Sequence, residues 1–146
     1  MNNIFDGYES QCKKQQKKIV SQERQSSHVA CNINESLVRQ YRLDNVVIPR
    51  NEQKVCDYIV FNDDKQTVYL IELKGKHVKD AIEQIQMTEE RIKDSIKAYK
   101  RFYRIVFRGS ATHSISKTTL LKWKKAHRKN GVYYANYARE KYEEEI

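Results

Sequence analysis

Two short apolar segments separated by a polar turn constrain the fold of this chain more than any other feature. Residues 55–61 and 67–73 are rich in Val, Ile, Tyr and Phe, which favour strands. Residues 62–65 between them read Asn-Asp-Asp-Lys, a typical turn composition. The pattern therefore predicts a β-hairpin, in which side chains two residues apart project to the same face.

Three charged side chains interrupt or end these apolar strands. Asp57 lies in the first strand, and Glu72 and Lys74 share one face of the second. Two neighbouring carboxylates repel one another unless a cation neutralises them. Mg²⁺ suits this role because it prefers oxygen ligands, and the Leu73 main-chain carbonyl offers another oxygen. Lys74 can then stabilise charge on a phosphate or orient a metal-bound water. An exposed salt bridge between Glu72 and Lys74 is the alternative explanation.

A long helix and a further strand follow the hairpin. From Val78 the hydrophobic period changes from two to about 3.6, which predicts a helix over 78–100 that packs on the sheet. Residues 102–107 then read as a strand. Because a helix precedes it, we expect a parallel crossover connection to the sheet.

Before the hairpin, the sequence predicts a short helix and a short strand. Asn34 can cap a helix over 34–43, which carries an apolar stripe at helical spacing. Residues 46–48 read as a strand that Pro49 ends.

The overall charge favours a polyanionic partner. The chain has 146 residues, enough for one domain, with 28 Lys+Arg against 19 Asp+Glu and a net charge of +9. This balance suits nucleic acid or an anionic membrane surface, and solubility is the alternative explanation. No segment approaches the ~20 apolar residues that span a bilayer, and the N-terminus lacks a signal-peptide pattern. We expect a cytoplasmic protein without a membrane partner, whose three cysteines are free thiols and bind no zinc.

Basic residues concentrate in two segments outside the hairpin. Residues 1–30 predict a basic helix or a mobile arm, and residues 116–129 predict a basic helix that Gly131 ends. Both can contact phosphates; a solvated face and a packing helix anchored by Trp123 are the respective alternatives. Residues 132–134 can add an edge strand, and the acidic tail is expected to be solvated. The candidate nucleic-acid contacts are Lys13, Lys14, Lys17, Lys18, Lys122, Lys124, Lys125 and Lys129.

The spacing of the charged residues resembles that of the PD-(D/E)XK nuclease superfamily. Asp57 is followed by fourteen residues and then by Glu72-Leu73-Lys74, on a predicted hairpin that precedes a long helix. The resemblance covers residues 34–107 and implies an α/β fold with a restriction endonuclease-like core. That core is a helix, three strands, a crossover helix and a fourth strand (αβββαβ), with a central mixed four-stranded sheet flanked by helices. A basic C-terminal helix and an acidic tail, residues 116–146, would complete the single domain.

The resemblance also implies a function and a set of site residues. It implies an endonuclease that needs Mg²⁺, for which Mn²⁺ can substitute, and that hydrolyses phosphodiester bonds in DNA, in restriction, repair or phage defence. Asp57 and Glu72 would bind the metal with the Leu73 carbonyl, and Lys74 would be the catalytic lysine. Glu35 is the acid at a fitting place on the predicted first helix, and Gln84 or Gln86 matches a helix glutamine found in some members. The superfamily's usual proline before the aspartate is replaced by a cysteine here.

Other functions stay open at this level. A catalytically inactive module of the same fold could bind nucleic acid or protein without cutting it. A small basic protein that binds RNA or ribosomes would explain the charge, although it would not explain acids within apolar strands. DNA is the more natural substrate, RNA is an alternative, and a homodimer is an arrangement that the sequence leaves open.

Overall fold

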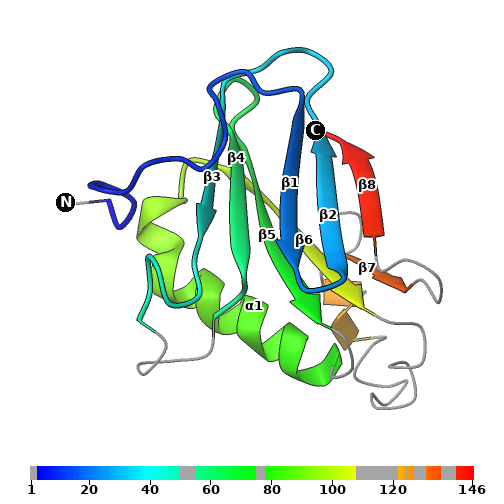
Figure 1. Ribbon diagram of the computed structural model, residues 1–146. Coiled ribbons are helices and arrows are strands. Elements are labelled where there is room, and N and C mark those ends of the chain that lie inside the picture. Colours follow the sequence, from blue (N-terminus) through cyan, green and yellow to red (C-terminus); the bar gives the residue numbers. More distant parts are fainter. Residues whose placement is uncertain are drawn as a thin grey trace.

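The computed structural model describes residues 3–49, 55–74, 78–107, 122–123, 125–126, 131–135 and 141–146. The elements in order are β1 (Lys18–Glu23), β2 (Ser26–Cys31), β3 (Val38–Arg42), β4 (Tyr58–Asn62), β5 (Thr67–Lys74), α1 (Val78–Ile92), the 3₁₀ turn η1 (Lys93–Ser95), β6 (Lys100–Phe107), β7 (Gly131–Ala135) and β8 (Lys141–Glu145). The chain has an α/β fold with two sheets (Figure 1). One sheet has five strands in the order β3-β4-β5-β6-β7, and the other has three in the order β1-β2-β8.

The five-stranded sheet is mixed. β3, β4 and β5 are antiparallel neighbours, whereas β6 is parallel to β5 and β7 is parallel to β6. The predicted hairpin, the helix after it, the parallel crossover and the edge strand at 132–134 are therefore confirmed. The implied core has four strands and the sheet has five, of which β7 is the predicted edge strand. The predicted strand at 46–48 is wrong, because these residues form a turn with one isolated bridge between Asp44 and Ile48.

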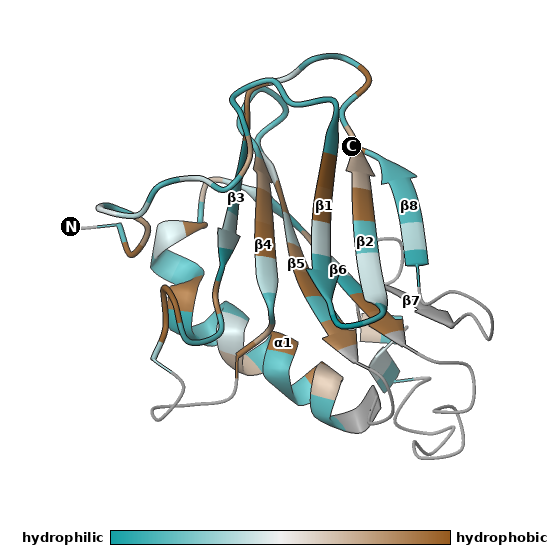
Figure 2. Ribbon diagram, in the orientation of Figure 1, coloured by the Kyte–Doolittle hydropathy of each residue, from teal (hydrophilic) through white to brown (hydrophobic). Residues whose placement is uncertain are grey.

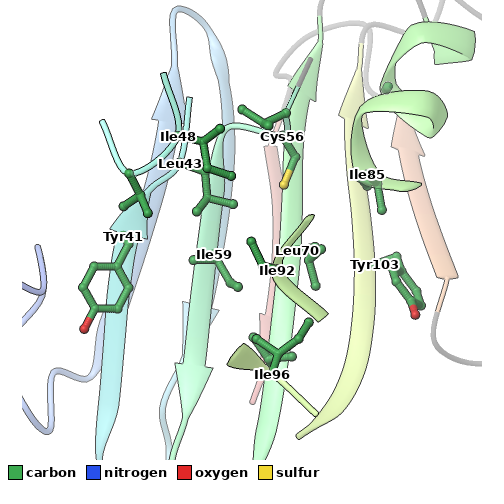
Figure 3. Close-up of a cluster of buried hydrophobic side chains, with 14 of the residues drawn as sticks. Tyr41, Leu43, Ile48, Cys56, Ile59, Leu70, Ile85, Ile92, Ile96 and Tyr103 are labelled. Carbon is green, nitrogen blue, oxygen red and sulfur yellow. The ribbon is translucent and has the colours of Figure 1, made fainter. Parts of the chain in front are cut away.

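Helix α1 covers one face of this sheet. Alternate apolar residues of β4 and β5, such as Ile59 and Leu70, pack with Ile85 of α1 in one buried cluster (Figure 3). The helix ends at Ile92, earlier than predicted, and η1 and a turn follow it. Apolar spacing continues past the helix end because residues there, including the buried Ile96, still pack into the same cluster.

The opposite face is covered by the three-stranded sheet, where flanking helices were expected. Ile19 of β1 and Ala30 of β2 pack with Val60 and Ile71 in a second buried cluster. The helix or mobile arm predicted within residues 1–30 is wrong, because this part of the chain contains the β1–β2 hairpin. The lysines predicted to share a helix face lie elsewhere: Lys13, Lys14 and Lys17 precede β1, and Lys18 begins it.

Polar residues at inward positions explain why the sequence did not indicate these strands. β1 alternates between exposed and buried positions, but one of its buried positions holds Ser21. The same is true of β3, which replaces the helix predicted over 34–43. Gln40 of β3 is buried and donates hydrogen bonds to Val20 O at 2.8 Å and to Ser21 Oγ at 2.9 Å. A buried polar residue breaks the apolar alternation that marks a strand.

The C-terminal residues complete both sheets. The acidic tail, predicted to be solvated, forms β8 and pairs in parallel with β2, and Glu144 lies in an ion-pair network. β8 is hydrophilic along its length, in contrast to β4 (Figure 2). Of the predicted helix 116–129, the described residues 122–123 and 125–126 are helical, and Trp123 packs against Tyr103 at a ring distance of 5.8 Å. Trp123 is 3% exposed, so it anchors this segment in the core.

Two further expectations can be compared with the described part of the chain. All three cysteines are free thiols, as predicted. Among the described residues, no helical segment combines the length and the apolar character that a bilayer span requires.

Candidate carboxylate site

Asp57 and Glu72 face one another at the end of the β4–β5 hairpin that is remote from its turn. Asp57 directly precedes β4, and the pairing of Tyr58 with Ile71 places Asp57 opposite Glu72. Helix α1 begins four residues after Lys74, the last residue of β5. Asp57 is 7% exposed and Glu72 is 1% exposed. The sequence-predicted pair is thus brought together in a largely buried position.

Hydrogen bonds to the main chain fix this pair. Asp57 N donates to Glu72 Oε1 at 3.1 Å, and Leu73 N donates to Asp57 Oδ2 at 2.9 Å. Leu43 N donates to Asp57 O at 2.9 Å, which extends the pairing of β3 with β4. Glu72 thus accepts a hydrogen bond from the main chain of Asp57, and Asp57 accepts one from the main chain of Leu73, the residue after Glu72.

The surroundings of Asp57 disfavour its ionised form. Burial raises the pKa of Asp57 above its usual 3.8, and the charge of Glu23 raises it further. Hydrogen bonds with Leu73 N and with the Glu72 side chain, together with the charge of Arg42, act in the opposite direction without cancelling the effect of burial on this pKa. A divalent cation bound by the two carboxylates would favour the ionised form of both.

Glu23 and Arg42 are neighbours of the pair that sequence reasoning missed. Glu23, the last residue of β1, forms an ion pair with Arg42, the last residue of β3. The Arg42 guanidinium also lies 5.3 Å from the centre of the Tyr58 ring and donates to the Tyr58 hydroxyl. No local signal could have placed Glu23 near Asp57, because their proximity depends on how the two sheets pack.

One predicted catalytic residue, Glu35, does not join this pair, and the side chain of another, Lys74, lies outside the described residues. Glu35 is exposed and has a positive φ of 50°. It lies just before the first residue of β3, whereas Arg42 is the last residue of that strand. The structure thus separates Glu35 from Asp57, because the helix that was to present it is a strand. The main chain of Lys74 ends β5 opposite Phe107, and its side chain is outside the described set, so its role stays a prediction.

Gln84 does reach the neighbourhood of the site. Its Nε2 donates to Val55 O at 3.1 Å, two residues before Asp57, and its Oε1 is buried without a hydrogen-bond partner among the described residues. Gln86, the alternative glutamine, is exposed. Of the two, Gln84 is therefore the one that contacts the chain leading to Asp57.

The basic segment at the N-terminus lies away from the carboxylates. Val38 N donates to Lys14 O at 2.7 Å, which places the lysines at the end of the sheet opposite Asp57. The six residues of β1 between Lys18 and Glu23 span about 17 Å. Lys13, Lys14, Lys17 and Lys18 are exposed, as are Lys122 and Lys125; Lys124 and Lys129 lie outside the described residues.

The described residues supply only a small number of candidate metal ligands at this site. Within that part of the chain, no group of three or more His, Cys, Asp or Glu side chains is placed to hold a metal ion. Asp57 and Glu72 nevertheless supply adjacent carboxylate oxygens, the donor type that Mg²⁺ prefers, and two carboxylates with waters and substrate phosphate are a common Mg²⁺ shell. The residues present therefore fit a partly hydrated ion held by the pair. The Leu73 carbonyl stays a predicted third ligand.

Comparison with models of known protein families, with curated proteins and with solved structures finds no match to this chain. The candidate site therefore rests on its own geometry.

Proposed function

We propose that this protein is a Mg²⁺-dependent endonuclease that hydrolyses phosphodiester bonds in DNA, with Asp57 and Glu72 as metal ligands. The observation that carries the proposal is the burial of these two acids on paired strands at one end of the sheet, where Asp57 N donates a hydrogen bond to Glu72 Oε1. Burying two acids side by side destabilises a fold, so such a pair is more often found where it has a task.

The arrangement of elements around the pair supports a PD-(D/E)XK assignment in part. The β3–β4–β5 meander, α1 and the parallel β6 follow the order of three strands, crossover helix and fourth strand. The departure is the missing first helix, whose place before the meander is taken by the β1–β2 hairpin. A restriction endonuclease-like core with a substituted N-terminal layer is accordingly part of the proposal.

The roles of the chain's own residues follow from their positions. Bound Mg²⁺ would supply charge neutralisation and would lower the pKa of a coordinated water. Asp57 and Glu72 would hold the ion, and their main-chain hydrogen bonds would keep both carboxylates oriented before substrate arrives. Lys74 would stabilise charge that develops on the phosphate. Lys54 and Lys76, within four residues of these acids in the chain, add positive charge that suits a polyanionic substrate.

Cleavage assays test the proposal directly. Supercoiled plasmid, linear duplex, branched DNA and a matched RNA would be incubated with Mg²⁺, with Mn²⁺ and with EDTA. We expect cleavage that needs a divalent ion, prefers DNA, and is lost in Asp57→Asn but kept in Asp94→Asn, which removes one exposed acid from η1. Equal cleavage in EDTA and in Mg²⁺, or full activity of Asp57→Asn, would refute it.

A second function is favoured by one observation. Both carboxylates already accept main-chain hydrogen bonds, so the pair can also serve to close the strand ends without a metal. A catalytically inactive module that binds nucleic acid or protein would use the acids in this way. It predicts DNA binding that is the same with Mg²⁺ and with EDTA, and no cleavage under any condition.

A further inference from the structure

Two side chains of α1 hold the chain immediately before Asp57. Thr88 Oγ1 accepts a hydrogen bond from Cys56 N at 2.8 Å, and Gln84 Nε2 donates to Val55 O at 3.1 Å. Val55 and Cys56 precede the first residue of β4 and lie outside the sheet ladder. The Cys56 N–H and the Val55 carbonyl are therefore hydrogen-bonded to the helix instead of to a neighbouring strand.

The Thr88 hydroxyl acts both as a hydrogen-bond donor and as an acceptor. It donates to Gln84 O at 2.6 Å, so its one proton is committed and its lone pairs are available to Cys56 N. Thr88 and Cys56 are both 0% exposed, and Cys56 lies within the apolar cluster beneath α1 (Figure 3). Water cannot replace the hydroxyl there. Without it, the Cys56 N–H would be buried without a hydrogen-bond acceptor, which destabilises this position of the chain.

The position of Cys56 is transmitted to the carboxylate pair through one peptide unit. Asp57 N donates to Glu72 Oε1, and Asp57 Oδ2 accepts from Leu73 N. A displacement of the main chain at Cys56 therefore changes both of these contacts. Helix α1 follows β5 in the chain, so the strand that carries Glu72 leads directly into the helix that holds Cys56.

We propose that Thr88 is a positioning residue for the carboxylate pair: by binding Cys56 N, it fixes where Asp57 stands relative to Glu72. The catalytic consequence rests on the function proposed above, whereas the structural consequence does not.

Two substitutions at one position separate the hydroxyl from the shape of the side chain. Thr88→Ser keeps the oxygen, and Thr88→Val keeps the volume but removes it. In Mg²⁺-dependent cleavage we expect kcat of Thr88→Val to fall about 10- to 100-fold, the usual effect of losing a group that orients a metal ligand. The KM for DNA should change little, because Thr88 is fully buried and cannot contact the substrate itself. Thr88→Ser should retain most of the wild-type kcat.

A matched control shows that the effect is not a general loss of stability. Ile92→Val removes one methylene from a buried residue one turn further along α1 and should lower the stability of the fold modestly. We expect it to leave kcat unchanged. If Thr88→Val does not fold, Thr88→Ala replaces it, since it also lacks the hydroxyl. Wild-type kcat in the hydroxyl-free variant, or an equal loss in Thr88→Ser or Ile92→Val, would overturn the proposal.

Amide hydrogen exchange tests the positioning independently of any activity. The Leu73 N–H should exchange faster in Thr88→Val than in wild type or in Thr88→Ser, because its acceptor on Asp57 is displaced. Unchanged Leu73 exchange in Thr88→Val overturns the proposal whatever the cleavage assays show. If wild-type protein cleaves nothing but Leu73 exchange responds as expected, the endonuclease function fails and the positioning role of Thr88 stands.

Discussion

Arg104 of β6 and Glu144 of β8 form a bidentate ion pair that joins the two sheets. Arg104 Nε donates to Glu144 Oε2 at 2.7 Å and Nη2 donates to Glu144 Oε1 at 3.0 Å. His28 of β2 completes the network, with its Nε2 2.6 Å from Glu144 Oε2. The Arg104 and Glu144 side chains are only 6% and 12% exposed, so three strands that are distant in sequence are linked by polar groups largely removed from water.

Removing one member of this network should destabilise the fold. We expect Arg104→Met to lower the free energy of unfolding by about 3 kcal/mol, because it leaves the Glu144 charge buried with one partner fewer. The double variant Arg104→Met/Glu144→Gln should recover part of that loss, since both charges are gone while an amide oxygen stays available to His28 Nε2. Urea denaturation of the single and double variants measures both effects. A loss of under about 0.5 kcal/mol in the single variant would show that the pair contributes little.

The same network predicts a pH dependence of stability. Burial by itself raises the pKa of Glu144, but hydrogen bonds from His28 and Arg104 outweigh it and hold the pKa below the usual 4.5. Because the folded-state pKa is lowered, ionised Glu144 stabilises the fold above pH 4.5, and this contribution is lost as the pH falls through the folded-state pKa. Glu144→Gln should therefore be less stable than wild type near neutral pH, and the difference should shrink in acid. Denaturation curves across the acid range check this, and a difference that does not change with pH would contradict it.

Glu72→Gln should separate metal binding from folding. The amide oxygen can still accept the hydrogen bond from Asp57 N, so the free energy of unfolding without metal should be equal to or above that of wild type, because one buried charge is removed. Mg²⁺-dependent cleavage should fall by at least about 100-fold, the upper range for residues that only support a metal ligand. Mg²⁺ should also raise the melting temperature of wild type but not of Glu72→Gln. Glu9→Gln, at an exposed position, is the charge-matched control.

The basic segments should contribute affinity without affecting the chemistry. Replacing Lys13, Lys14 and Lys17 with Gln removes three exposed charges at the end of the sheet remote from Asp57. If they contact phosphates, DNA affinity should fall and the dependence of log K on log salt should become shallower by about one unit per lost contact. The cleavage rate at saturating DNA should be unchanged.

The exposed lysines beside Trp123 allow the same comparison. Lys122→Gln/Lys125→Gln should weaken binding in the same manner if this helical segment faces nucleic acid. Binding isotherms at two salt concentrations distinguish this from a segment that only packs through Trp123. An unchanged slope would remove the segment from the DNA surface.

The elements of the fold that the sequence predicts correctly are those marked by a local apolar pattern. The β4–β5 hairpin and the parallel β6 contain short runs of β-branched and aromatic residues, the start of α1 has an apolar repeat of about 3.6, and each of these elements is present. The meeting of Asp57 with Glu72 follows from the hairpin alone, because antiparallel pairing across one turn places the two residues opposite each other. No long-range information was needed for that contact.

The other sheet, the edge strand β3 and the wider surroundings of the site depend on contacts between distant residues. Ser21 and Gln40 are buried because they bond each other, and His28 is buried because Glu144 and Arg104 lie next to it. Each of these residues, taken alone, favours an exposed position, so a local pattern cannot show that it is inside. The same reason applies at the site. The Glu23–Arg42 ion pair and the hydrogen bond from Cys56 N to Thr88 Oγ1 form only when β1 and α1 pack on opposite faces of one sheet. The sequence thus specified the acids, whereas the tertiary structure specified the groups that surround and position them.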